Sequence, residues 1–203
     1  MNKDYLKQVP LIAIIRGVKP SEVLAVTQAI YDGGIRCVEV PLNSPRAYES
    51  IKLIADKFGD KMLLGAGTVL SIDQVQKVKE AGGEIIVSPN VNSKVIKETK
   101  KLAMLSYPGI MTMSEAFMAL EAGADALKLF PADSVGKSFI KASKAVLPKG
   151  TEIYAVGGVD LSNVKDWTEA GADGFGLGGS LYKPGKDLSQ LAQDAQSFCL
   201  LVK

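Results

Sequence analysis

The sequence predicts an α/β protein: a single domain, residues 1–203, folded as a (β/α)8 TIM barrel with a short N-terminal helix. Two observations point to this fold. Short apolar segments alternate with helical patterns along the chain, and 203 residues lie at the short end of what one such barrel needs. An open doubly wound sheet has the same alternation, but the even spacing of the strands and the absence of a GxGxxG turn after the first one favour the barrel.

Eight short apolar segments have the length of buried parallel strands. In chain order they are LIAII near Ile14, CVEV near Val38, MLLGA near Leu64, EIIV near Ile86, AMLSY near Leu105, ALKLF near Leu129, EIYAV near Tyr154 and DGFGL near Phe175.

Helical patterns fill the gaps between these strands, for example from Ser21, from Ser44 and from Ser71. Two helix starts carry capping-box spacing, with a hydroxyl residue three positions before Glu or Gln. These pairs are Ser71 with Gln74 and Thr112 with Glu115.

A recurring phrase marks four of the helix-to-strand junctions. The helix ends in an acidic residue, small residues and glycine, and a short apolar strand follows at once. Glycine just past a helix can adopt the left-handed conformation that closes its last turn. The copies recur about two strand-helix units apart, as DGGIRCVEVP from Asp32, EAGGEIIVSPN from Glu80, EAGADALKLFP from Glu121 and EAGADGFGLGG from Glu169.

The composition excludes several classes of function. A net charge of +2 gives no general attraction for nucleic acid or membranes, so we expect a small-molecule partner held by a local site. The N-terminal apolar run is too short for a signal segment, and Cys37 and Cys199 lie far apart, which favours a cytoplasmic protein with reduced thiols. The chain has no histidine, and we expect neither a metal nor another cofactor.

Three charged residues interrupt or end apolar strands: Arg16, Glu39 and Lys128. Burying a charged side chain there is costly unless the charge is paired or used, so these residues are candidates for a functional site. Apolar neighbours of Lys128 would penalise its ammonium form, and a neutral amine can attack a ketone. Glu39 is the best remaining acid/base candidate, and Arg16 offers a planar fork for a carboxylate or phosphate. The alternative is a structural ion pair between Lys128 and Glu39, or a lysine that points into solvent.

Glycines at two strand ends predict an anion site. Loops after the seventh and eighth strands of such barrels often bind phosphate through backbone N–H groups. Thr68, after the third strand, could donate a hydroxyl hydrogen bond to a substrate carboxylate or simply belong to a turn. The loop residues are Gly157 and Gly158 after the seventh strand, and Gly178, Gly179 and Ser180 after the eighth.

These residues resemble the KDPG/KHG aldolase family over nearly the whole chain. The matching phrases are IAIIRG, VEVPLNSP, GAGTVL, VSPN, YPG, LKLFPA, AVGGV and GLGGSLY. The resemblance implies a class I aldolase that cleaves a 2-keto-3-deoxy-6-phospho sugar acid to pyruvate and D-glyceraldehyde 3-phosphate, usually as a homotrimer. It assigns the Schiff base to Lys128, acid/base work to Glu39, the pyruvate portion to Thr68 and Arg16, and phosphate binding to the glycine loops.

Two positions resemble the galactonate branch of the family more than the gluconate branch. Asn43 stands where the gluconate branch commonly carries a substrate-contacting arginine, and Val156 where it tends to have threonine. The two substrates differ only at C4, so a small change beside the C4 hydroxyl could decide between them. The resemblance therefore implies the 6-phosphogalactonate substrate in preference to the 6-phosphogluconate one.

Two rival functions follow from the same residues. A metal-dependent phosphosugar epimerase would share the phosphate loops, but such enzymes rely on histidine ligands that this chain lacks. A non-catalytic barrel could bind a phosphorylated metabolite and keep Lys128 and Glu39 as a buried pair.

Overall fold

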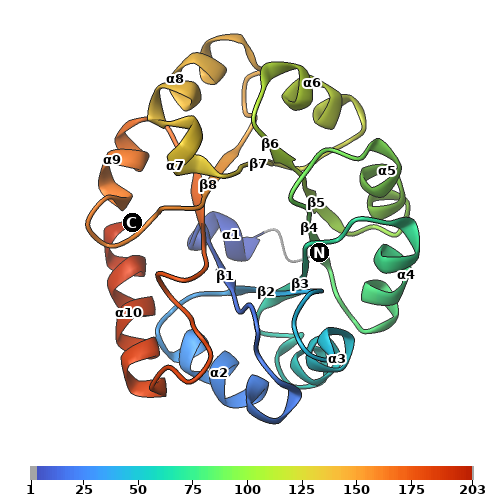
Figure 1. Ribbon diagram of the computed structural model, residues 1–203, viewed down its shortest axis with the longest axis vertical. Helices are drawn as coiled ribbons and strands as arrows, with labels where there is room; N and C mark the ends of the chain where they lie inside the picture. The colour runs from blue at the N-terminus through green and yellow to red at the C-terminus, as the bar shows by residue number, and fades with distance from the viewer. Residues whose placement is uncertain (1–3, 203) are drawn as a thin grey trace.

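The computed structural model describes residues 4–202 and has the expected barrel. Nine parallel strands form a ring. In the view down the barrel every helix except the short N-terminal one lies around this ring (Figure 1). The strands are β1 (Leu11–Ile14), β2 (Cys37–Pro41), β3 (Leu63–Gly67), β4 (Ile85–Val87), β5 (Leu105–Tyr107), β6 (Gly109–Ile110), β7 (Leu127–Leu129), β8 (Ile153–Val156) and β9 (Gly174–Leu177).

Helices follow the strands in alternation and include the expected short one at the N-terminus. No helix within residues 4–202 is long and apolar enough to cross a membrane. The helices are α1 (Asp4–Gln8), α2 (Pro20–Asp32), α3 (Ala47–Phe58), α4 (Ile72–Glu80), α5 (Ser93–Lys101), α6 (Met113–Glu121), α7 (Ala132–Val135), α8 (Lys137–Val146), α9 (Val164–Glu169) and α10 (Leu188–Leu201).

The fifth expected strand is β5, and Pro108 separates it from a further short strand, β6, that was not expected. β5 pairs with β4, whereas β6 pairs with β7, and the sheet order runs β5-β4-β3-β2-β1-β9-β8-β7-β6. Proline has no N–H to donate, but its carbonyl still accepts the Lys128 N–H at 2.9 Å. Because β5 and β6 are separated by one residue, the two ends of this order meet and the ring closes.

The four predicted glycine junctions adopt the expected left-handed conformation. The φ angles are 101° at Gly34, 88° at Gly82, 99° at Gly123 and 99° at Gly171. Each glycine closes its helix as in a Schellman motif, in which the two residues after the last turn donate to its carbonyls. The sequence pattern did not reveal a fifth junction of this kind, between α5 and β5, because Ala103 occupies the glycine position with φ of 56°.

Residues alternate between the inside and the outside of the barrel along every strand. The outward residues pack against the helices in the larger core cluster, and the inward residues form a second cluster with Leu6 of α1. Lys7 of α1 lies beside Asp125 and Glu152, just before β7 and β8, so α1 covers the amino-terminal end of the barrel. The carboxyl-terminal end stays open.

Candidate active site

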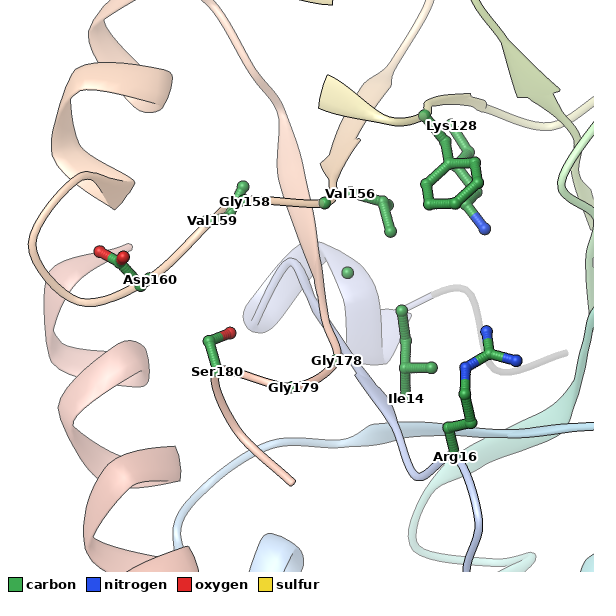
Figure 2. Close-up of a pocket in the computed structure, with 13 residues that line it drawn as sticks. Ile14, Arg16, Lys128, Val156, Gly158, Val159, Asp160, Gly178, Gly179 and Ser180 are labelled. Carbon is green, nitrogen blue, oxygen red and sulfur yellow. The ribbon is translucent and has the colours of Figure 1, made fainter. Parts of the chain in front are cut away.

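The open end of the barrel holds a cavity of about 560 Å³. Figure 2 shows the Lys128 side chain of β7 and the Arg16 side chain of the loop after β1 pointing into it, with Gly178, Gly179 and Ser180 along another side. Eight of the eleven predicted site residues line this cavity: Arg16, Lys128, Val156, Gly157, Gly158, Gly178, Gly179 and Ser180.

Lys128 is a buried lysine in the middle of β7 that reaches the cavity. Its side chain faces inward because Ala126, two residues earlier, belongs to the inner cluster. Only 7% of the residue is exposed. Burial lowers the pKa of Lys128 below its ordinary value; the Glu39 carboxylate opposes this shift and Arg16 adds to it.

Glu39 lies inside the barrel on β2 and is 2% exposed. Burial raises its pKa from 4.5 to about 7, although Lys128, Arg16 and a hydrogen bond from the Gly67 backbone all act in the opposite direction. One carboxylate oxygen, Oε2, has no hydrogen-bond partner within residues 4–202. Glu39 is therefore a buried carboxyl group able to gain or lose a proton near neutral pH.

The charges of Lys128 and Glu39 interact electrostatically, but the two side chains do not form a close ion pair. Each shifts the pKa of the other. Yet the ion pairs of 4.0 Å or less within residues 4–202 do not join the two side chains. The Lys128 Nζ instead lies 4.4 Å from the centre of the Phe130 ring. This geometry disagrees with a simple structural ion pair and with a lysine that points into solvent.

Arg16 is tied to Asn43 at the rim of the cavity. The Arg16 guanidinium donates to the Asn43 Oδ1 at 2.5 Å. A second bond joins the same two loops, because the Gly17 N–H donates to the Ser44 hydroxyl at 2.9 Å. Asn43 itself is not among the cavity-lining residues. Its connection to the site is the hydrogen bond to Arg16.

The loops after β8 and β9 present backbone amides to the cavity. Gly157 and Gly158 have φ angles of 98° and 72°, which favour glycine. The Gly178 carbonyl accepts the N–H groups of Leu181 and Tyr182, both at 2.9 Å, so a single helical turn begins there. The first amides of a helical turn point away from it and suit an anion.

Gly178 has no structural reason to be glycine within the described chain. A Cβ at this position would meet nothing within 4 Å, and its φ is not positive. A glycine that neither packing nor backbone conformation requires, on the wall of a cavity, fits close approach of a ligand to the backbone. The residue thus supports the predicted anion site independently of the loop pattern.

Thr68 follows β3 in a conformation that is unusual for its type. Its φ is 59°, in the left-handed region that a β-branched residue rarely adopts. Such strain clusters at functional sites. Thr68 does not line the cavity, but it adjoins Gly67, whose backbone binds Glu39.

The sequence reasoning did not select several residues that line the cavity. Asp160 is the charged one: its carboxylate accepts the Ser162 N–H at 2.8 Å, a capping arrangement ahead of α9. Asn163 is the N-cap residue of α9, and its Oδ1 accepts the Asp160 N–H at 3.0 Å, so an asparagine ahead of this helix is the sequence signal that could have located the loop. The others are apolar or glycine: Ile14, Phe130, Val159 and Gly176. Within residues 4–202 no group of three or more metal-ligating side chains is gathered.

Comparison with known proteins places this chain in an enzyme family. Residues 3–195 match the family model for KDPG and KHG aldolase. The 2-dehydro-3-deoxy-6-phosphogalactonate aldolase of Escherichia coli (strain K12) is 48% identical over 195 residues, which cover 96% of this chain and 95% of that protein.

Solved structures agree with this match. One described as native KDPGal superposes with a TM-score of 0.92 at 48% identity, covering 94% of this chain and 92% of that chain. A KDPG aldolase from Legionella pneumophila has a TM-score of 0.83 at 25% identity, covering 98% of this chain and 96% of that chain. The latter was solved with pyruvate captured at low pH as a covalent carbinolamine intermediate.

Proposed function

The chain belongs to the KDPG and KHG aldolase family of lyases, and we propose that it cleaves a 2-keto-3-deoxy-6-phospho sugar acid to pyruvate and D-glyceraldehyde 3-phosphate through a Schiff base on Lys128. The observation that carries the proposal is a lysine with a lowered pKa that reaches an open cavity inside an apolar barrel. The covalent carbinolamine of the Legionella pneumophila relative supports it, because pyruvate forms such an adduct with an amine.

The reaction begins with the neutral Lys128 amine attacking the C2 ketone. The resulting carbinolamine loses water and becomes a cationic imine. The C3–C4 bond then breaks, its electron pair moves to C3 to form an enamine, and the C4 hydroxyl loses its proton to give the aldehyde. Protonation at C3 and hydrolysis of the imine release pyruvate and restore the lysine. The reaction is balanced, because the water lost when the imine forms is regained when the imine is hydrolysed.

Glu39 is the proposed proton carrier in these steps. Its pKa of about 7 lets the same carboxyl group take the C4 hydroxyl proton, through a water molecule, and return a proton to C3. A glutamate with an ordinary pKa near 4.5 would be a weaker base towards the C4 hydroxyl proton, and almost none of it would be protonated near neutral pH to supply a proton to C3.

The rim of the cavity would bind the two anionic ends of the substrate. We assign the phosphate to the backbone amides of the loops at Gly157 and Gly178, and the carboxylate to Arg16. The family resemblance adds Thr68 to the carboxylate site, although Thr68 is not among the cavity-lining residues. Arg16 is held by Asn43, so Asn43 acts by positioning the arginine.

We propose the galactonate substrate in preference to the gluconate one. The Escherichia coli relative named for 6-phosphogalactonate is 48% identical, whereas the Legionella pneumophila KDPG aldolase is 25% identical. Val156 lines the cavity on β8 with a side chain that cannot hydrogen-bond a C4 hydroxyl. Measuring pyruvate release from both C4 epimers, with wild type and Val156→Thr, tests this preference; equal rates with the two epimers would contradict it.

Borohydride reduction of the enzyme with pyruvate tests the Schiff base. We expect a reduced pyruvate adduct on the peptide that contains Lys128 and none in Lys128→Ala. Lys141→Ala is the matched control, because Lys141 lies exposed on α8 away from the cavity. An adduct on another lysine, or activity that survives Lys128→Ala and is lost with a chelator, would overturn the proposal.

We also propose one domain, a homotrimer and a cytoplasmic location. Pairing of β1 with β9 joins the two ends of the chain in one sheet, which supports a single domain. Cys37 and Cys199 are both buried, as suits small core residues in a reducing compartment. The trimer rests on the family resemblance, and light scattering of the purified protein measures the mass of the assembly.

A further inference from the structure

The Phe130 ring lies under the amine of Lys128. Nζ is 4.4 Å from the ring centre, within the range of a cation–π interaction. Three other cations within residues 4–202 lie over aromatic rings, but Lys57 is exposed and Arg36 and Lys137 are half-buried. Among these pairs only that of Lys128 has a buried cation, where the low dielectric makes the interaction strongest.

Local structure fixes this contact. Lys128 and Phe130 are two residues apart at the end of β7, so their side chains leave the strand on the same face. The Phe130 N–H donates to the Ile110 carbonyl at 3.2 Å, which continues the β6 ladder and holds the backbone at the ring. The ring also lines the cavity, so a substrate bound to Lys128 would lie against it.

We propose that the face of the Phe130 ring stabilises the positive charge of the Lys128 imine, which makes Phe130 a catalytic residue. This inference rests on the Schiff-base function proposed above. An aromatic face carries negative potential that attracts a cation. The neutral amine that starts the reaction lacks this charge and the imine has it, so the ring would stabilise the reactive state more than the neutral one.

A ring suits this task better than the nearby carboxylate. Glu39 must alternate between its protonated and ionised forms to move protons, so its charge is absent in part of the cycle. Arg16 bears the wrong sign and disfavours a cation on Lys128. The ring offers a fixed potential that takes no proton, and it excludes water from the imine.

Fluorinated phenylalanines test the proposal at constant shape. Each added fluorine weakens the negative potential of the ring face with little change in its size, and it makes the ring more apolar. We would place mono-, di- and trifluorophenylalanine at position 130 and measure kcat and the rate of borohydride trapping with pyruvate. We expect a stepwise fall of both, reaching about tenfold or more for the trifluoro ring. The same series at Phe117, 47% exposed on α6, should have no effect.

Three outcomes decide the matter. A stepwise fall at position 130 with a flat series at position 117 supports the cation–π role. Rates that are equal along the series, or that rise with fluorination, mean that Phe130 acts only by packing and overturn it. Absence of any pyruvate adduct in the unsubstituted protein is a separate result, because it contradicts the Schiff-base function itself.

Discussion

The Glu39 carboxylate occupies the space that a side chain at position 67 would need. A Cβ on Gly67 would lie 2.0 Å from the Oε2 of Glu39 and 2.4 Å from its Cδ. The Gly67 backbone also lowers the pKa of Glu39 and so favours its carboxylate form. Glycine at the end of β3 therefore places the buried carboxyl group, and any larger residue must displace it.

Gly67→Ala is accordingly expected to inactivate the enzyme through Glu39. If the displaced carboxyl group no longer reaches the proton it transfers, kcat should fall on the order of 100-fold or more, as for loss of a general acid or base. Steady-state kinetics measure the loss, and circular dichroism checks that the barrel persists.

The matched control uses a shorter carboxylate. Glu39→Asp frees room beside position 67, so adding Glu39→Asp to Gly67→Ala should recover part of the activity, although Glu39→Asp alone lowers it. Additive losses in the double variant would mean that the two positions act independently.

The raised pKa of Glu39 predicts that the protein loses stability as pH rises. The pKa is 4.5 in an unperturbed glutamate and about 7 in the fold, because burial disfavours the carboxylate. Between these values the folded protein holds a proton that the unfolded chain releases, so the free energy of unfolding falls as pH rises through this window. The loss is on the order of 3 kcal/mol.

Urea unfolding of wild type and Glu39→Gln at about pH 5 and about pH 8 measures this effect. The neutral glutamine cannot titrate, so the variant should gain stability relative to wild type between the two conditions. An unchanged difference would show that Glu39 titrates at its ordinary pKa.

Asn43→Ala should weaken substrate binding through Arg16. The guanidinium loses its 2.5 Å hydrogen bond to Asn43 and gains rotational freedom, so KM should rise by about three- to tenfold with little change in kcat. In an Arg16→Ala background the same substitution should change nothing further. An equal effect in both backgrounds would mean that Asn43 contacts the substrate directly.

Gly178→Ala separates phosphate binding from imine formation. The added Cβ meets no protein atom within 4 Å, so the melting temperature should stay within about 2 °C. The methyl group would obstruct a phosphate at the backbone, and we expect KM for the phosphorylated substrate to rise about tenfold or more. Borohydride trapping with pyruvate, which has no phosphate, should be unaffected. A parallel loss of trapping would place the glycine at the imine instead.

Ala103→Gly should stabilise the protein. Ala103 adopts a left-handed conformation, φ 56°, that costs a non-glycine residue roughly 1 to 2 kcal/mol. Glycine removes this cost, but its greater conformational entropy in the unfolded chain offsets part of the gain in stability. We expect a net gain of about 0.5 to 1 kcal/mol in urea unfolding. The matched variant Gly123→Ala, at the equivalent position before β7, should lose a similar amount or more. Equal stabilities would show that the left-handed turn is unstrained.

Much of the fold could be predicted from local chemistry. Gly34, Gly82, Gly123 and Gly171 signal the ends of helices because no other residue adopts the left-handed conformation so readily, and the apolar segments after them are too short to be anything but strands. The division of β5 from β6 at Pro108 was missed, because it depends on which neighbouring strand each half meets.

The sequence by itself determined which residues are candidates for chemistry. Lys128 and Glu39 stand out in it because charge within an apolar strand is costly unless it has a use. Only the tertiary structure decided what surrounds them. The Gly67 backbone against Glu39, the Phe130 ring beneath Lys128 and the hold of Asn43 on Arg16 all depend on how strands close into a ring, and closure brings together side chains whose distances no local pattern encodes.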